Sequence, residues 1–528
     1  MADTYDVVVV GSGFGGAVTA ARLAEAGRSV CLLERGRRWE AGEYPRTLSE
    51  AEEGVWDEQR HYGFLEYKVF RRMDVVQGVG VGGGSLHYFN VHLRTPAEIF
   101  DRPEWPEPLS RPVLDRYYDR VGDVMEARPL EPPAGKRMPA RTEAFLDAAR
   151  RAGYEPELVP IAVHTGPTRE HPVSGLVQEP CAFTADCLLG CRPRSKNSLD
   201  VTFLPLGERA GLEIRPLHVA ERIEAAPGGE GWTVTARRLD PDRPGGPSEP
   251  RRVTGRTVVL AAGTLGTNEL LLRARDVDRT LPRLPAGVGR RYSPNGDMLF
   301  AGTMDADRRI DPSDGPSITA GTLVRGRSGN LVHVQDLGFP PALTSFADGA
   351  IPVRKRLASI GRAALSYVAA SRGGPPFRAA LLLGGSFVPR LLPYLGMGTD
   401  AADGVFRIDR TGRLALDWDP SASMDMFGDM ENVMKGLSRA LGGEFLPSPP
   451  WHPPFRRLLT AHPLGGCVMS NSPATGVTDH RGEVWDHPGL FVADGAVVPG
   501  PLAVNPSLTI AALAERTAHW LIHGREAG

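Results

Sequence analysis

The clearest pattern of hydrophobic and polar positions opens the chain, where an apolar run at 7–10 leads into a glycine-rich turn at 11–16. An unbroken apolar run before such a turn is typical of a buried parallel strand. The stretch 17–26 is rich in alanine and free of proline, which predicts a helix. A second apolar run at 30–33 predicts another strand, and the carboxylate of Glu34 follows it directly.

Strand, glycine turn, helix, strand and acid in this order match the βαβ unit that binds a dinucleotide. Gly11 permits the tight turn, Gly13 lets the main chain approach a pyrophosphate, and Gly16 lets helix and strand pack closely. Glu34 is placed to accept hydrogen bonds from a ribose 2′-hydroxyl, and it would repel a 2′-phosphate. A glycine loop that served packing alone would account for Gly16 but not for Glu34. The N-terminal segment therefore predicts a bound adenine dinucleotide.

Similar patterns return later in the chain. Apolar runs at 257–262 and 489–493 each lead into a glycine turn, and the second also delivers the carboxylate of Asp494. Short alternating runs between 214 and 259 predict antiparallel strands. A long amphipathic pattern at 507–521 predicts a closing helix.

Together these elements predict an α/β protein with more than one domain, as expected for a chain of 528 residues. A discontinuous Rossmann-type domain would hold the dinucleotide. The stretches between its parts are rich in proline or irregular, and they would form a second domain that caps the cofactor and shapes a substrate cavity. We assign to the first domain residues 1–100, 195–300 and 455–528, and to the second domain residues 101–194 and 301–454.

Composition narrows the functional classes. Hydrophobic residues make up 41% of the chain and charged residues 23%, which is ordinary for a globular protein. The 61 basic and 63 acidic residues leave a net charge of −2, so nothing indicates an electrostatic hold on nucleic acid. The first strand begins too early for a signal peptide, and no apolar stretch is long enough to cross a bilayer. We therefore expect a cytoplasmic protein without a transmembrane segment.

The segment 377–395 is apolar but is interrupted by glycine, arginine and proline. We expect it to form a buried wall or a lid over the substrate. A peripheral contact with a membrane surface is the alternative.

Several further motifs lie in a fixed order along the chain. They are GVGVGGGSL at 78–86, GCRPRSKNSL at 190–199, SPNGD at 293–297, AHPLGGC at 461–467, VADG at 492–495 and VNPSLTI at 504–510. With the N-terminal unit these motifs resemble the glucose–methanol–choline (GMC) oxidoreductase family, and within it the cholesterol-oxidase-like branch, in which GPNGN is similar to the motif at 293–297. The resemblance implies an α+β substrate domain on a mainly antiparallel sheet, and it is weakest near 100–180 and 340–400.

This resemblance implies FAD as the dinucleotide. Ala220 would contact the adenine through its main chain, and the closing helix would point its N-terminus at the flavin, where a helix dipole favours negative charge. The residues that the resemblance implies for FAD binding are Gly11, Gly13, Phe14, Gly15, Gly16, Glu34, Gly82, Gly83, Ser85, His87, Ala220, Asp494, Gly495, Asn505, Pro506 and Ser507.

The implied reaction is the oxidation of a hydroxyl group on a bulky, largely apolar alcohol, with sterols and steroids as candidates. A hydride passes to flavin N5, so a nearby group must accept the hydroxyl proton, and histidine titrates in a suitable range. By resemblance His462 is this base, and Asn505 orients the substrate oxygen. Oxygen or another electron acceptor then reoxidises the flavin.

Asp336 is a third candidate for catalysis. It lies in the stretch 332–340, which resembles a strand of the branch that carries an active-site glutamate. Because that glutamate serves steroid double-bond isomerisation, the shorter side chain of Asp336 puts isomerase activity in doubt. The alternative is an acid that caps a turn at the end of a strand.

His87 follows the second glycine loop, at an offset where some GMC members carry a histidine bonded covalently to the flavin. A covalent bond at His87 would prevent loss of the cofactor. A pocket histidine without such a bond is the alternative.

Three of the five cysteines form a cluster, Cys181, Cys187 and Cys191. Their spacing is compatible with an iron–sulfur cluster, as in some GMC sugar dehydrogenases, but buried free cysteines also act as small hydrophobes. The functional alternatives are therefore a sugar or polyol dehydrogenase with such a cluster and a GMC flavoenzyme that acts on a specialised metabolite. A flavoprotein that binds a partner without turnover is the alternative from outside enzymes.

Overall fold

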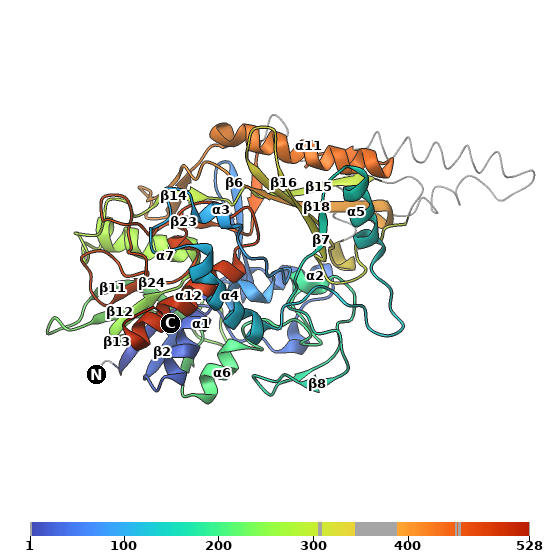
Figure 1. Ribbon diagram of the computed structural model, residues 1–528. Coiled ribbons are helices and arrows are strands. Elements are labelled where there is room, and N and C mark those ends of the chain that lie inside the picture. Colours follow the sequence, from blue (N-terminus) through green and yellow to red (C-terminus); the bar gives the residue numbers. More distant parts are fainter. Residues whose placement is uncertain (1–2, 305–308, 344–387, 449–450, 452–455, 527–528) are drawn as a thin grey trace, which may run out of the picture.

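The computed structural model describes residues 3–304, 309–343, 388–448, 451 and 456–526, and Figure 1 shows their arrangement. Its first sheet gathers the apolar runs of the sequence from distant parts of the chain. The parallel strands, in spatial order, are β10 (Glu213–Arg215), β2 (Val30–Leu33), β1 (Asp3–Val10), β13 (Glu249–Leu260) and β24 (Leu490–Val492). Two antiparallel strands extend the sheet from β13, namely β12 (Trp232–Arg238) and β11 (His218–Ala225).

The parallel register brings the carboxyl ends of four strands to one edge. Val10 of β1 is level with Leu33 of β2 and with Leu260 of β13, and Leu260 is level with Val492 of β24. The turns that follow these strands therefore lie side by side. In α/β sheets, ligands bind at this edge.

A layer of helices packs against this sheet through α1 (Phe14–Glu25). This alanine-rich helix begins in the first glycine turn and contacts both α12 (Ser507–His523) and α6 (Phe203–Arg209). The small residues of α1 are almost all buried, because they allow the close approach of these neighbours. In Figure 1, α4 (Arg111–Met125) lies next to α12, in agreement with their contacts.

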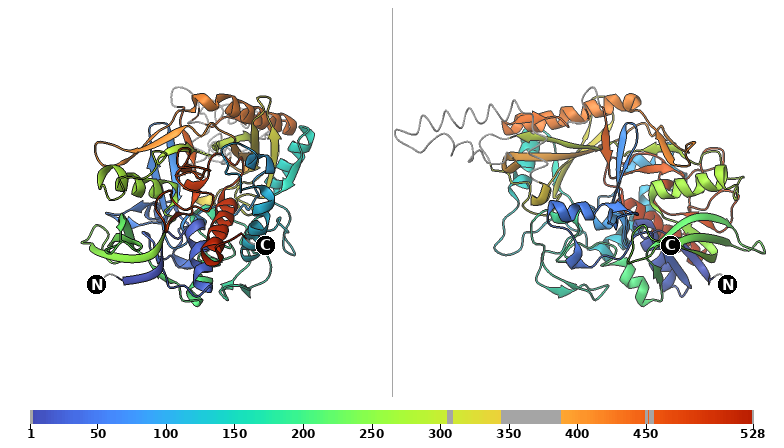
Figure 2. Two further views of the ribbon diagram at one scale, coloured as in Figure 1. Left: turned by 60° about the vertical axis from the view of Figure 1, so that its left-hand side comes forward. Right: turned by 180° about the vertical axis from the view of Figure 1, so that it is seen from behind.

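The second sheet is antiparallel at every pairing among the described residues, so the predicted fold class is confirmed. Helices α5 (Ala140–Arg151) and α11 (Met424–Leu441) pack against it. Figure 2 shows from behind that α11 lies along the side of the molecule far from the first sheet. The strand order is β21 (Glu444–Leu446), β15 (Met298–Met304), β18 (Leu391–Gly398), β17 (Leu331–Asp336), β16 (Ala320–Arg325) and β7 (Pro156–Leu158).

Smaller elements connect the two large sheets. The three-stranded sheet β22 (Leu458–Thr460), β6 (Met73–Gly78) and β5 (Leu65–Val69) lies beside β15. A four-stranded sheet contains β20 (Leu414–Asp417), β19 (Gly404–Ile408), β14 (Arg290–Ser293) and β23 (Leu464–Gly466). Among the described residues, the other strands form the hairpins β3 (Trp56–Asp57) with β4 (His61–Tyr62) and β8 (Arg169–Glu170) with β9 (Val177–Gln178), and the other α-helices are α2 (Leu48–Glu53), α3 (Ala97–Phe100) and α7 (Gly263–Leu272).

The apolar segment at 377–395 is described only in part. Residues 377–387 lie outside the described residues, and 391–395 belong to β18 in the interior of the second sheet. Residues 391–395 therefore form a buried wall. Across the residues that the structure describes, no helix combines the length and the apolar character needed to cross a membrane.

Asp336, expected from the sequence as a third candidate for catalysis, lies at the end of β17 in contact with Arg141. The side chains of Asp336 and Arg141 are both fully buried, and the Nε of Arg141 lies 3.3 Å from a carboxylate oxygen of Asp336. The same carboxylate accepts hydrogen bonds from the main-chain N–H groups of Thr319 and Ala320, each at 2.8 Å, and from two threonine hydroxyls. Asp336 thus links β17 to β16 and α5, and its carboxylate does not line the cavity described below.

We expect Asp336→Ala to destabilise the protein strongly, because it leaves the guanidinium of Arg141 buried without its ion partner. The loss for a broken buried pair is about 3–5 kcal/mol in the free energy of unfolding. Asp147→Ala is the control, since it breaks the more exposed pair with Arg151, worth about 1 kcal/mol or less. Chemical denaturation of both variants checks this, and equal small losses would contradict it.

Candidate active site

A cavity of 1490 Å³ lies where the two large sheets meet. Pockets for a single drug-sized ligand are roughly 300–1,000 Å³, so this cavity has room for a dinucleotide and a second molecule. It is lined by the turns after β1 and β2, by β5, β6 and β11, by the second sheet and by the start of α12.

At the carboxyl edge of the first sheet, Glu34 joins the two glycine loops. Its buried carboxylate accepts hydrogen bonds from the main-chain N–H of Ser12 at 3.0 Å and of Gly36 at 2.9 Å. It also accepts one from the hydroxyl of Ser12 at 2.7 Å and one from the N–H of Gly80 at 3.3 Å. Glu34 lines the cavity as well, so the carboxylate that was assigned to a ribose also fixes the shape of the loops around it.

The glycines of these loops serve two different purposes. A Cβ at Gly15 would lie 1.6 Å from the carbonyl oxygen of Ala493, and one at Gly16 would lie 1.9 Å from that of Gly11. These two glycines are required by packing. A Cβ at Gly13 would have no atom within 4 Å, and Gly13 lines the cavity. Its lack of a side chain therefore leaves space for a ligand.

The residues expected to bind the cofactor fall into two groups, those that line the cavity and those that do not. Gly16, Gly82 and Ser85 do not line the cavity, and the Ser85 hydroxyl donates to the carbonyl oxygen of Gly82 and accepts from the N–H of Leu199. The expected residues that do line it are Gly11, Gly13, Phe14, Gly15, Glu34, Gly83, His87, Ala220, Asp494, Gly495, Asn505, Pro506 and Ser507.

Ala220 and Asp494 show how the cavity's polar lining is built. Ala220 lies on β11, an edge strand that is irregular between Ala220 and Arg222, so its main chain is open to a ligand. The carboxylate of Asp494 accepts hydrogen bonds from the Thr267 hydroxyl at 2.5 Å and from the N–H of Ala496 at 2.8 Å. Burial raises the pKa of Asp494 to about 6.

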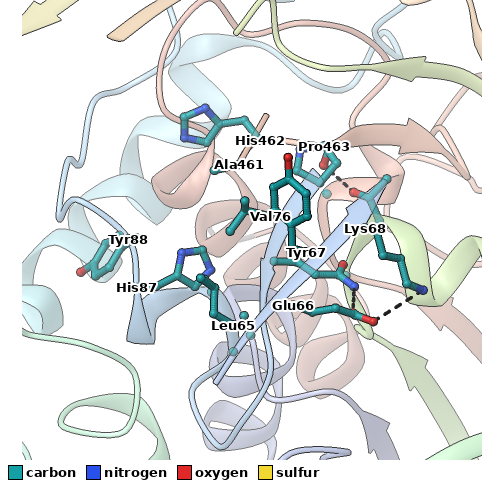
Figure 3. Close-up of a pocket in the computed structure, with 18 of the residues that line it drawn as sticks. Leu65, Glu66, Tyr67, Lys68, Val76, His87, Tyr88, Ala461, His462 and Pro463 are labelled. Carbon is teal, nitrogen blue, oxygen red and sulfur yellow. Dashed lines mark hydrogen bonds and ion pairs between the residues drawn. The ribbon is translucent and has the colours of Figure 1, made fainter. Parts of the chain in front are cut away.

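His462 lies at the other end of the cavity, on the loop after β22. Figure 3 shows its ring above those of His87 and Tyr67, with Pro463 beside it. Its Nδ1 lies 2.8 Å from a carboxylate oxygen of Asp297, which is fully buried. The second oxygen of Asp297 accepts hydrogen bonds from the Thr460 hydroxyl at 2.7 Å and the N–H of Ala461 at 3.2 Å. The Nε2 of His462 has no hydrogen bond among the described residues.

Asn505 precedes α12 and also lines the cavity. Its side-chain oxygen accepts a hydrogen bond from Nε2 of Gln335 at 2.8 Å, which leaves its NH2 group for another acceptor. Asn295 fixes the preceding loop, because its side chain donates to the carbonyl oxygen of Val504 and accepts from the N–H of Leu502. Asp297, Asn295 and Gln335 were not selected from the sequence. They lie inside the motif at 293–297 and beside Asp336, which were the available signals.

The second sheet supplies an apolar wall to the cavity that His462 also lines. Along β18 every second residue faces the cavity, at 391, 393 and 395. No member of this wall is charged or polar. The apolar wall consists of Leu299, Ala301, Leu337, Phe339, Leu391, Pro393, Leu395 and Leu446.

Comparison with known proteins identifies the family of the chain. Two sequence profiles, each described as GMC oxidoreductase, match residues 5–275 and 451–514. The chain belongs to the GMC oxidoreductase family. It is therefore an FAD-dependent oxidoreductase of alcohols, as the sequence resemblance predicted.

Relatives of this GMC protein include a cholesterol oxidase from Mycobacterium tuberculosis, 29% identical over 98% of this chain and 91% of the relative. A long-chain-alcohol oxidase from Arabidopsis thaliana is 25% identical over 96% of this chain and 65% of its own length. A solved structure of a fungal aryl-alcohol oxidase has a TM-score of 0.61 at 17% identity, with 99% of this chain and 100% of that chain covered. It shows that the fold is shared.

The residues present fit FAD. The open space at Gly13, the exposed main chain of β11 and the cavity's volume all suit a dinucleotide. His87 adds an unsatisfied polar atom, because its Nε2 is buried without a hydrogen-bond partner among the described residues. Burial lowers the pKa of His87 to about 3, so its imidazole is neutral at physiological pH.

Two sulfur atoms of the cysteine cluster form hydrogen bonds with neighbouring side chains. Cys187 accepts a hydrogen bond from the side-chain amide of Asn90, and Cys191 shares one with the hydroxyl of Ser195. Burial raises the pKa of Cys181 to about 12 and also raises that of Cys191, which favours thiols. Within the described ranges, no group of three or more His, Cys, Asp or Glu side chains is arranged to bind a metal ion.

We expect Gly13→Ala and Gly15→Ala to fail for different reasons. Gly13→Ala should leave the melting temperature of the apoprotein unchanged but weaken FAD binding by about 1–3 kcal/mol, since the methyl group occupies ligand space. Gly15→Ala should lower the melting temperature itself. Flavin absorbance per protein and thermal melting of the apoproteins separate these effects, and full flavin content in Gly13→Ala would contradict the assignment.

Proposed function

We propose that the protein oxidises a hydroxyl group on a bulky, largely apolar alcohol, with a sterol as the substrate class. The single observation that carries this proposal is the apolar wall, which lines the same cavity as the polar pair His462 and Asn505. An apolar alcohol buries its carbon skeleton favourably against such a wall and has one polar group to satisfy. The cholesterol oxidase and the long-chain-alcohol oxidase among the relatives support the same class.

His462 is the base in this proposal. When FAD is bound, it supplies the acceptor for the hydride that leaves the substrate carbon. The hydroxyl proton passes to Nε2 of His462, the ring nitrogen that has no hydrogen bond among the described residues. Such proton transfer by a positioned side chain contributes typically about 10²–10⁴-fold to the rate.

Asn505 holds the substrate oxygen. Gln335 donates to the Oδ1 of Asn505, so the NH2 group of Asn505 is directed to the substrate as a donor. One group therefore takes the proton while the other keeps the oxygen in place, which fixes the carbon–hydrogen bond relative to the hydride acceptor.

The electron acceptor in this proposal is molecular oxygen, as in the relatives that are named oxidases. Since Asp336 is held by Arg141 and does not line the cavity, we propose oxidation without double-bond isomerisation. A sterol would then be released as its ketone with the ring double bond in its original position.

Anaerobic addition of cholesterol is expected to bleach the flavin absorbance of the wild-type protein. His462→Gln should slow this bleaching by about 10²–10⁴-fold, because the proton loses its acceptor. His523→Gln at the exposed end of α12 is the control and should react like the wild type. A flavin that stays oxidised with cholesterol would remove sterols from the proposal, and 1-dodecanol is then the next substrate to add.

Removal of His87 tests its contact with the flavin. We expect His87→Ala to retain less FAD through gel filtration, because Nε2 gains its partner only when the cofactor fills the cavity. Acid precipitation of the wild type decides between the two forms of this contact. Flavin in the pellet of the wild type but not of His87→Ala establishes a covalent bond at His87, and flavin in the wild-type supernatant shows that the contact is non-covalent. Undiminished FAD in His87→Ala would contradict both.

A further inference from the structure

Both carboxylate oxygens of Asp297 have hydrogen-bond partners in the protein interior. One oxygen faces Nδ1 of His462 at 2.8 Å, and the other accepts from the hydroxyl of Thr460 at 2.7 Å and the N–H of Ala461 at 3.2 Å. The side chain is fully buried, where an ionised carboxylate is stable only if such donors surround it. Two donors from Thr460 and Ala461, just before His462 in the chain, therefore hold it next to the imidazole.

This contact decides which ring nitrogen of His462 carries the proton. An ionised carboxylate can only accept, so the nitrogen that faces it must be the Nδ1–H. In the neutral ring Nε2 then carries the accepting lone pair, and this nitrogen has no hydrogen-bond partner among the described residues. The resting histidine is thus already in the form that can take a proton from an alcohol.

The same contact also favours the protonated ring. When Nε2 takes the hydroxyl proton, the imidazolium carries a positive charge in a largely buried site, with 16% of the side chain exposed. The carboxylate at 2.8 Å lies close enough to balance this charge, and the interaction is stronger than in water because solvent is excluded.

We propose that Asp297 is the positioning residue of an Asp–His dyad, in which it fixes the tautomer of His462 and balances its charge as the proton arrives. The proposal rests on the proposed role of His462 as the base. In the proton transfer the O–H bond of the substrate breaks and an N–H bond forms at Nε2 of His462. The proton does not move on to Asp297, which keeps its charge throughout.

Asp297→Asn is the informative variant, because an asparagine here would favour the other tautomer of His462. Its amide oxygen can still accept from Thr460 and Ala461, so the shape and most of the hydrogen bonds remain. Its NH2 group would then face the ring and require a lone pair at Nδ1. The proton would move to Nε2, and the histidine would offer a donor to the substrate in place of an acceptor.

The tautomer can be read without any substrate. We expect two-bond ¹⁵N–¹H correlation spectra of the FAD-loaded, histidine-labelled protein to show His462 as the Nδ1–H tautomer, with the signal assigned by its loss in His462→Gln. In Asp297→Asn the pattern should change to Nε2–H. An Nε2–H pattern in the wild type, or an unchanged pattern in Asp297→Asn, would overturn the proposal.

Kinetics then separate a role through His462 from a merely structural one. With cholesterol under anaerobic conditions, Asp297→Asn should slow flavin reduction by about 10²–10⁴-fold, as expected for a base in the wrong tautomer. In the double variant with His462→Gln the rate should equal that of His462→Gln alone, because both changes remove the same function. Losses that multiply in the double variant would show that Asp297 acts independently of His462.

Thr460→Val is the matched control. It removes one hydroxyl that donates to Asp297 but keeps the carboxylate beside Nδ1. We expect less than about tenfold slower reduction, and a loss equal to that of Asp297→Asn would assign the effect to loop structure and overturn the dyad.

The two proposals fail in different ways. If wild-type flavin is not reduced by cholesterol or 1-dodecanol, or if His462→Gln is as fast as the wild type, the proposed function is wrong, while the tautomer spectra still decide whether Asp297 controls His462. If His462→Gln is slow and Asp297→Asn is fast, the proposed function stands and the dyad is wrong.

Discussion

The constraint on which the rest of the structure depends is the parallel register of β2, β1, β13 and β24. Because Val10, Leu33, Leu260 and Val492 are level, four turns emerge at one edge and must pack against one another. Main chain meets main chain there, as the 1.6 Å gap between a Cβ at Gly15 and the Ala493 oxygen shows. The turns need glycine for this packing, and the carboxylates of Glu34 and Asp494 satisfy main-chain N–H groups that would otherwise lack partners.

The second sheet completes the cavity by the alternation of its strands. Side chains on a strand point to opposite faces in turn. Gln335 therefore reaches Asn505 and Leu337 lines the cavity, while Asp336 between them points to Arg141 on α5. The same alternation in β18 places residues 391, 393 and 395 on the cavity side. It leaves Gly396 against α11, where a Cβ would lie 2.3 Å from the sulfur of Met430.

The polar end of the cavity is assembled from three segments that are far apart in the sequence. The loop 293–297 supplies Asp297 and Asn295, the loop after β22 supplies His462, and the turn before α12 supplies Asn505. Each of the two side chains that face the substrate space is held by a partner behind it, Asp297 for His462 and Gln335 for Asn505. In the proposed reaction their hydrogen-bonding roles are therefore set before a substrate arrives, which reduces the reorganisation needed for proton transfer.

The sequence alone determined the fold class, the family and the dinucleotide unit, because these depend on local patterns: apolar runs, glycine turns and a helix of small residues that follow one another directly. It also marked the loops that carry His462 and Asn505. It could not determine which neighbouring side chain on β17 points toward Asn505, since a shift of one residue reverses the face. The resemblance selected Asp336 on this strand, whereas in the structure Gln335 hydrogen-bonds to Asn505 and Asp336 pairs with Arg141. Only the tertiary structure paired Asp297 with His462, because 165 residues separate them and a hydrogen bond across that separation leaves no periodic signal in the chain.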